Sequence, residues 1–353
     1  MKIDYTFFDR MLNHDPALPA VPLYEHGVDY PVIRAIMGYA DDPDLSTKEG
    51  LLTFWKRWID FYDQMGYPYV SVEMSAFFPQ IAMKAGRSEG DEVTRGYVDE
   101  NEGIIKGWED LEDPELWTPV EECFPFDLYA EVLAMVPPHM KAVGGCSGGP
   151  FENATFLMGL TPFCLNLYED EELVEALLQK VGERLVYAAD RLCGLEKLGV
   201  YRFGDDLGFK NATMISPEAL RKYIFPWQKK VVETVHRHGK KFVLHSCGQL
   251  ESVMEDLIDE VGIDAKHSFE DVILPVTEAK RRWGDRIALL GGVDVDFLCR
   301  AEPKAIRERT LEILKICAPG GGYAAGTGNT VTSYMPPRNY LAMKAAVDEF
   351  NGL

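Results

Sequence analysis

Short apolar runs alternate with amphipathic helical patterns along most of the chain, which has 353 residues. Runs of this length, bounded by polar or glycine-rich segments, are typical of buried strands. The eight runs are Ala20–Tyr24, Tyr69–Met74, Lys141–Cys146, Val200–Asp206, Lys241–Cys247, Ile263–Ser268, Ile287–Asp294 and Gly322–Gly326. Because strands that alternate with helices are joined by crossovers, these strands are predicted to be parallel. Eight such units in this length predict a closed α/β barrel, a (β/α)8 TIM barrel, as a single domain over residues 1–353.

Helix-end signals support this alternation. Ser46 followed three residues later by Glu49 predicts a capping box, in which the serine accepts from the first helical turn. Ser216 followed by Pro217 predicts another helix start. Residues 75–140 do not fit one crossover and predict an extended loop or inserted region near the barrel mouth. Further helices are predicted over residues 171–198, 250–261 and 303–316.

Charge narrows the function classes. Lys and Arg total 36 against 57 Asp and Glu, which gives a formal net charge of −21. A surface this acidic argues against nucleic acid and anionic membranes, because both require an excess of basic residues. It also argues against a polyanionic substrate. The chain contains no apolar run of membrane-spanning length and starts with a charged segment, so we expect a cytoplasmic protein.

The sharpest chemical signal is the segment Phe242-Val-Leu-His245-Ser-Cys247-Gly248. Side chains alternate along a strand, so His245 and Cys247 are predicted to share one face at the barrel mouth. Histidine plus cysteine is a ligand pair that Zn²⁺ favours. The alternative is a hydrogen-bonded histidine beside a buried structural cysteine.

Further polar residues follow other predicted strands. Asp205 and Asp206 end an apolar run, so one is predicted to face the pocket and the other to cap the loop; they could bind a cation or act as acid and base. Turn chemistry is the alternative for both. Asp294 is available at another predicted strand end, and the glycine-rich segment 320–329 could bind phosphate through its backbone N–H groups; tight turns are the safer interpretation.

Acidic and imidazole side chains also follow the first two runs. Glu25 and His26 come directly after the first run, and Glu73 lies near the end of the second. Each alone is consistent with a solvated side chain. Because the strand ends of a barrel meet at one mouth, together they predict a polar pocket there.

Taken together, these motifs resemble the uroporphyrinogen decarboxylase superfamily over about residues 20–350. The resemblance rests on Gly148-Gly-Pro150-Phe-Glu152, Leu157-Met-Gly159, Gly204-Asp205-Asp206-Leu-Gly208, Leu244-His245-Ser-Cys247-Gly248, Gly291-Gly-Val-Asp294 and Ala318-Pro-Gly-Gly-Gly322-Tyr. It implies a (β/α)8 barrel, in agreement with the alternation of strands and helices.

Two branches of the superfamily differ in what they bind. The true decarboxylases grip a substrate with eight carboxylates through an arginine-rich segment near the N-terminus. The corresponding segment here reads Pro22-Leu-Tyr-Glu25-His26-Gly27 and has no arginine. An acidic Glu25 would repel a polycarboxylate, so we expect a different activity.

The other branch holds cobalamin-dependent methyltransferases. The resemblance implies zinc on His245 and Cys247, but the third ligand of the coenzyme M members, a cysteine, is replaced by Gly321. A carboxylate such as that of Glu73 is the expected substitute. The motif positions Gly248, Asp294 and Gly321 are the expected cofactor-binding residues.

The sequence therefore predicts a corrinoid-dependent methyltransferase. A methyl group would pass from a small methoxylated, including aromatic, or methylated donor to a cobalamin, either free or on a partner corrinoid protein. The residues predicted to assist the chemistry are His26, Glu73, Asp205 and Asp206. A cofactor-independent decarboxylase of a small acid and a non-catalytic ligand-binding barrel are the alternatives, and a homodimer is left open.

Overall fold

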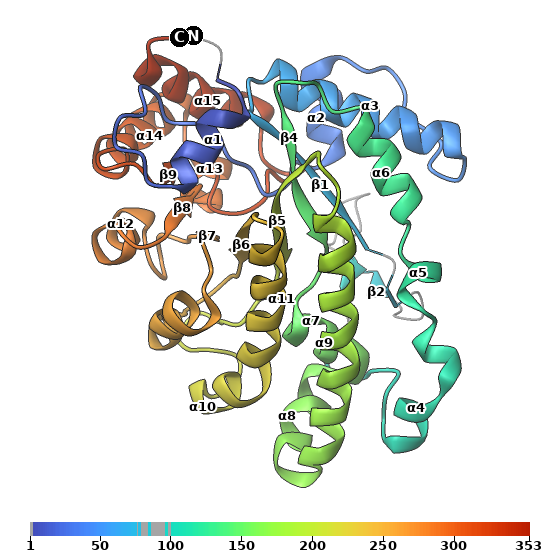
Figure 1. Cartoon of the computed structure of the whole chain (residues 1–353). Helices are drawn as coiled ribbons and strands as arrows, with labels where there is room; N and C mark the ends of the chain where they lie inside the picture. The colour runs from blue at the N-terminus through green and yellow to red at the C-terminus, as the bar shows by residue number, and fades with distance from the viewer. Residues whose placement is uncertain (1–2, 76, 79–83, 86–95, 98–99) are drawn as a thin grey trace.

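A computed structural model describes residues 3–75, 77–78, 84–85, 96–97 and 100–353. Within these residues, seven parallel strands form one curved sheet in the order β1-β4-β5-β6-β7-β8-β9. Helices surround this sheet, so the fold is an α/β barrel of the TIM type, as the alternation predicts (Figure 1). The strands are β1 (Tyr69–Met74), β4 (Lys141–Cys146), β5 (Leu198–Gly204), β6 (Lys241–His245), β7 (Ala265–His267), β8 (Ala288–Leu290) and β9 (Tyr323–Ala324).

The first predicted strand, Ala20–Tyr24, takes the eighth place of the barrel without forming a strand. It is joined to the end of β9 by two backbone hydrogen bonds, Tyr24 N–H to Ala325 O and Ala325 N–H to Pro22 O, each 2.8 Å. Toward β1 it is joined by a side chain, because the Tyr69 hydroxyl contacts both the N–H and the carbonyl of Glu25 at 2.7 Å. The prediction of eight strands is therefore corrected to seven strands and a bridged segment. Pro22 has no N–H to donate, which limits a ladder here.

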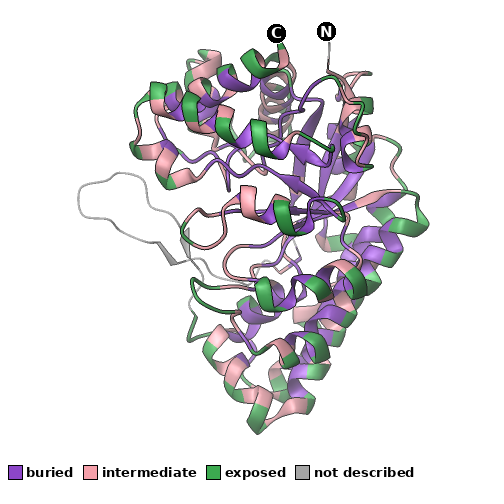
Figure 2. Cartoon of the chain, turned by 90° about the vertical axis from the view of Figure 1, so that its left-hand side faces the viewer, coloured by how far each residue is buried: buried purple, intermediate pink, exposed green. Residues whose placement is uncertain are grey.

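The helices pack with their apolar sides on the sheet and their polar sides outward, and Figure 2 shows the buried strands enclosed by them. Their bounds are α1 (Tyr5–Leu12), α2 (Tyr30–Met37), α3 (Lys48–Gln64), α4 (Trp108–Glu112), η1 (Pro114–Trp117), α5 (Val120–Cys123), α6 (Phe126–Ala134), α7 (Pro150–Met158), α8 (Leu160–Glu169), α9 (Glu171–Cys193), α10 (Pro217–Ala219), η2 (Leu220–Ile224), α11 (Phe225–Arg237), η3 (Glu251–Val253), η4 (Asp256–Val261), α12 (Val276–Trp283), α13 (Val295–Arg300), α14 (Pro303–Cys317) and α15 (Pro337–Asn351). Among the described helices, none is both long and apolar enough to cross a bilayer.

The predicted helix ends are partly corrected. The start at Ser216 is confirmed, because its hydroxyl accepts from Ala219 N–H at 3.1 Å. The capping box at Ser46 is wrong by one residue: Thr47 accepts from Gly50 N–H, while the Ser46 hydroxyl donates to Asp44. The helix predicted over 250–261 is a 3₁₀ turn followed by a π turn, η3 and η4, and the one predicted over 171–198 ends at Cys193.

Residues 75–140 form the predicted extended region, as far as they are described. A two-stranded hairpin, β2 (Lys84–Ala85) with β3 (Gly96–Tyr97), is followed by α4, η1, α5 and α6 before the chain enters β4. Trp108 donates to Asp170 at 2.9 Å, which ties α4 to the start of α9. Residues 76, 79–83, 86–95 and 98–99 lie outside the described part of the chain.

Candidate metal centre

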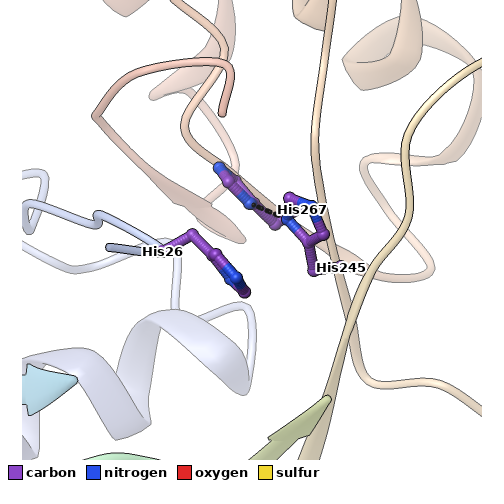
Figure 3. A group of neighbouring side chains, drawn as sticks. All are labelled: His26, His245 and His267. Carbon is purple, nitrogen blue, oxygen red and sulfur yellow. Dashed lines mark hydrogen bonds between the residues drawn. The ribbon is translucent and has the colours of Figure 1, made fainter. Parts of the chain in front are cut away.

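Three histidines meet where strands of the barrel end. His245 ends β6, His267 ends β7, and the two are paired in the parallel register. His26 enters from the segment that follows Tyr24, and its ring stacks on His245 with centroids 4.0 Å apart (Figure 3). The Nδ1 atoms of His245 and His267 lie 2.8 Å apart.

All three imidazoles are neutral near pH 7. Burial lowers the pKa of His245 to about 4, although the nearby Asp206 carboxylate acts in the opposite direction. Burial also lowers the pKa of His267 and of His26 well below the ordinary value, and the Arg202 guanidinium adds to the effect.

The hydrogen bonds then fix which nitrogen of His245 carries hydrogen. His267 Nε2 lies 3.3 Å from the Thr327 carbonyl oxygen, which only accepts, so Nε2 carries the hydrogen of His267. In a neutral ring the Nδ1 atom of His267 then carries no hydrogen, so it accepts from Nδ1–H of His245. The remaining nitrogen of His245, Nε2, is therefore an unprotonated electron-pair donor.

Nε2 of His245 faces a thiol and a carboxylate. It lies 3.5 Å from Cys247 Sγ and 3.8 Å from Asp206 Oδ1, and one ligand atom from each residue lies within 4.8 Å of the others. Burial raises the pKa of the Cys247 thiol to about 12, so a metal must displace this proton on binding. Once it does, the three facing atoms are all electron-pair donors, and His, Cys and a carboxylate suit Zn²⁺.

Two hydrogen-bond donors face the Cys247 sulfur. Asn329 Nδ2 lies 3.3 Å and the Ser268 hydroxyl 3.5 Å from Sγ, and both stabilise a thiolate. Ser268 holds a left-handed backbone with φ of 103°. Its carbonyl accepts from the buried Lys266 ammonium at 2.6 Å, which helps to hold this costly conformation.

Glu73, the predicted substitute for the missing thiolate, does not join this group. Its carboxylate lies 2.6 Å from Arg202 Nη2, and Arg202 also donates to Ser71 Oγ at 2.9 Å. A buried guanidinium requires a balancing charge, and Glu73 supplies it. Among the described residues, Asp206 is the carboxylate beside His245 and Cys247, which corrects the assignment of Glu73 as a ligand.

Neutralising Glu73 should destabilise the fold. Glu73→Gln leaves the Arg202 charge buried without a counter-ion, and we expect a loss of about 3 kcal/mol in the free energy of unfolding. Urea unfolding of the full chain measures this loss. The double variant Glu73→Gln/Arg202→Met should recover most of the stability; equal stability of Glu73→Gln and the parent chain would contradict the assignment.

Of the two adjacent aspartates, one faces the site, while the other supports the start of a helix instead of capping the following loop as predicted. Asp206 is the half-buried member, and it accepts from Cys247 N–H at 2.8 Å. Asp205 is fully buried and accepts from Glu152 N–H at 2.9 Å and from Gln228 at 2.7 Å, which anchors the start of α7. Burial raises the pKa of Asp205 to about 7. These contacts give Asp205 a structural role as a hydrogen-bond acceptor.

Glu25 is a buried acid that holds the end of β9. Its Oε1 accepts from Thr327 N–H at 2.9 Å, and its Oε2 lies 2.5 Å from the Thr327 hydroxyl. That hydroxyl also contacts the Asn329 carbonyl at 2.6 Å. A hydroxyl has one hydrogen, so both contacts are satisfied when Glu25 is protonated. Burial raises the pKa of Glu25 to about 8, which agrees. The expectation that a Glu25 charge repels polycarboxylates is therefore corrected.

The predicted cofactor-binding residues have different locations. Gly248 has a positive φ, and a Cβ there would lie 2.2 Å from the Gly208 carbonyl carbon, so it lets the loops after β5 and β6 meet. Asp294 caps α13 by accepting from Phe297 N–H at 2.9 Å. Gly321 precedes β9 and so lies at the amino end of the strand, away from the site, packed against the Asp15 carbonyl oxygen. The prediction that Gly321 binds the cofactor is therefore corrected.

A cleft of about 1110 Å³ opens beside this site. Asn329 lines the cleft and also contacts Cys247, so this residue lies between the cleft and the candidate metal centre. Acidic side chains outnumber basic ones in the lining. The acids are Asp29, Glu270, Asp271, Asp294 and Asp296, and the bases are Lys210 and Arg300. This lining disfavours anionic ligands.

Sequence reasoning missed His267, Ser268, Asn329 and Arg202. His267 and Ser268 end an apolar run predicted to be a strand. This position at a strand end could have identified them as candidate site residues. Arg202 lies in the middle of an apolar run, where a charge is expensive unless it is paired. Asn329 comes after β9 in a glycine-rich loop, and no pattern in the sequence points to its contact with Cys247.

The fold is an α/β barrel, and His245, Cys247 and Asp206 form a candidate metal site near the carboxyl ends of its strands. The family model described as uroporphyrinogen decarboxylase matches residues 102–350. The chain belongs to this family.

Curated relatives match part of the chain. The uroporphyrinogen decarboxylase of Coxiella burnetii is 28% identical over 145 residues, which are 39% of this chain and 38% of the relative. That of Chromohalobacter salexigens is 27% identical over 222 residues, or 59% of each chain. The matches thus span 38% and 59% of the lengths of these two relatives.

Solved structures match over nearly the whole fold. A methyltransferase from Methanosarcina mazei has a TM-score of 0.70 at 19% identity and covers 98% of each chain. A putative vitamin-B12-independent methionine synthase from Listeria monocytogenes has a TM-score of 0.51 at 12% identity, covering 94% of this chain and 98% of its own. Both likenesses concern the fold.

Proposed function

We propose that the chain is a methyltransferase that takes a methyl group from a small, non-anionic methoxylated or methylated compound. The acceptor is a corrinoid, either free or carried by a partner protein. The observation that carries this proposal is the convergence of His245 Nε2, Cys247 Sγ and the Asp206 carboxylate within 4.8 Å. The fold shared with the Methanosarcina mazei methyltransferase supports it.

The three converging residues would hold Zn²⁺. When bound, zinc supplies Lewis acidity that stabilises negative charge on a departing atom. Asn329 and Ser268 face the Cys247 sulfur as hydrogen-bond donors and would stabilise its thiolate once zinc displaces the proton. His26 stacks on His245 and covers it from one side. We place the methyl donor in the neighbouring cleft, because Asn329 lines this cleft and also contacts Cys247.

Decarboxylation is the second candidate, because the family and the curated relatives carry that name. The cleft opposes it. Acids predominate in its lining, and the buried Arg202 is already paired with Glu73, so it is not free for a substrate carboxylate. We therefore expect no release of CO2 from uroporphyrinogen and no binding of this octacarboxylate. Stoichiometric CO2 release without corrinoid would instead support the decarboxylase.

The test of the methyltransferase is an assay with zinc-loaded chain, reduced corrinoid and a panel of methoxyaromatic and methylated donors. Demethylation of the donor and methylation of the corrinoid are measured together. Asp206→Asn keeps the shape but removes a ligand charge, and we expect at least about a hundredfold lower rate, on the scale of a lost electrostatic contact. Asp285→Asn, which replaces an exposed aspartate outside the cleft, is the matched control. Equal rates for Asp206→Asn and the parent chain would contradict the proposed role.

A further inference from the structure

A buried series of contacts runs from Glu25 through Thr327 and His267 to the Nδ1 atom of His245. The Glu25 carboxyl group accepts from the Thr327 N–H at 2.9 Å and also contacts the Thr327 hydroxyl. Glu25, Thr327 and His267 are fully buried, so water does not compete for these contacts. The Thr327 carbonyl is thereby fixed at the end of β9, where it faces His267 Nε2 at 3.3 Å.

The Thr327 carbonyl determines the direction of the two hydrogen bonds that follow it. A carbonyl only accepts, so His267 donates from Nε2 and accepts at Nδ1. His245 consequently donates from Nδ1 across the contact drawn as a dashed line in Figure 3, and it presents Nε2 to Cys247 and Asp206. The opposite tautomer of His245 would place a hydrogen between the proposed ligand atoms.

We propose that His267 is a positioning residue that holds His245 in the Nδ1–H tautomer and thereby selects Nε2 as the metal ligand. The claim that Nε2 binds a metal rests on the proposed function. The claim about the tautomer of His245 rests on the hydrogen-bond geometry. His267 is not one of the three proposed ligands, and it acts through His245. It acts as the outer hydrogen-bond partner that metal-ligating histidines commonly require.

His26 does not provide an alternative. It contacts His245 through its ring face, with an interplanar angle of 27°, and its Nδ1 is buried without a hydrogen-bond partner in the described part of the chain. A ring stacked in this way covers His245 but offers its nitrogens no acceptor. The tautomer of His245 therefore depends on His267.

The first arm of the test needs no variant. Two-bond proton–nitrogen correlation spectra of the metal-free full chain, labelled with ¹⁵N-histidine, report which ring nitrogen carries hydrogen. We expect the Nδ1–H form for His245 and the Nε2–H form for His267. The Nε2–H form at His245 would overturn the proposal, whatever the enzymatic activity.

The second arm measures the affinity for Co²⁺, with the sulfur-to-cobalt charge-transfer band as the readout. We expect His267→Leu to lower the affinity by about 10–100-fold, the usual effect of losing such a partner. His267→Gln, which has both an acceptor and a donor, should recover most of it. His139→Leu, a histidine at the opposite end of the barrel, is the control and should bind like the parent chain.

The outcomes separate the two claims. Equal Co²⁺ affinity in His267→Leu and the parent chain would overturn the positioning role. Failure of methyl transfer with an intact Nδ1–H tautomer and an intact His267 effect would overturn the proposed function alone.

Discussion

Replacing Cys247 by alanine is expected to lower the affinity of the chain for Zn²⁺ by at least about a hundredfold, the upper end of what the loss of an outer-shell partner causes. The thiolate is the softest of the three converging ligands, and His245 with Asp206 alone leaves two. Methyl transfer should fall to background in the same variant. Zinc competition with a chromophoric chelator measures the affinity.

Cys317→Ala is the matched control for this loss. Cys317 is a fully buried thiol at the end of α14 and belongs to no group of converging ligands among the described residues. Its replacement should leave zinc affinity unchanged and lower only stability, since a small cavity remains. If Cys247→Ala binds zinc as tightly as Cys317→Ala, the sulfur is not a ligand.

Glu25→Gln is expected to stabilise the chain, and the gain should grow as the pH rises. In the folded chain burial raises the pKa of Glu25 from 4.5 to about 8, so the native state keeps the proton while the unfolded state loses it. Protonated Glu25 therefore contributes its full share of the native stability below pH 4.5. This contribution is lost as the pH rises from 4.5 toward 8. Each pKa unit corresponds to ~1.4 kcal/mol. Glutamine makes the same two contacts with Thr327 and has no proton to lose.

The measurement is urea unfolding of Glu25→Gln and the parent chain at several pH values from 5 to 8. We expect nearly equal stability at the acidic end and an advantage of at least about 2 kcal/mol for the variant at the basic end. Glu233→Gln, which replaces an exposed glutamate, should not change the pH profile. Parallel profiles for Glu25→Gln and the parent chain would show that Glu25 is ionised in the fold.

The barrel was predictable because its signal is local. Apolar runs such as Lys141–Cys146 and helix starts such as Ser216 carry their own period and end chemistry, and both have the predicted role. The first run was misread for a local reason too, since Pro22 limits the ladder and the segment is only bridged to β9.

The site was predictable only in part because its contacts join distant segments. The prediction that His245 and Cys247 lie together is confirmed, although β6 ends at His245 and Cys247 lies in the loop that follows. Spacing could not show which carboxylate is the third ligand, because Glu73 and Asp206 both lie near strand ends. The pairing of Glu73 with Arg202 decides between them. Gly321 was misplaced because a glycine-rich segment looks the same before a strand as after it.

Titration of the metal-free chain with Co²⁺ tests the central claim most directly. We predict that a thiolate-to-cobalt charge-transfer band saturates at one equivalent, is absent in Cys247→Ala, and weakens in His245→Ala and Asp206→Asn. A chain that binds no cobalt, or that shows the same band without Cys247, would contradict the assignment of this metal centre.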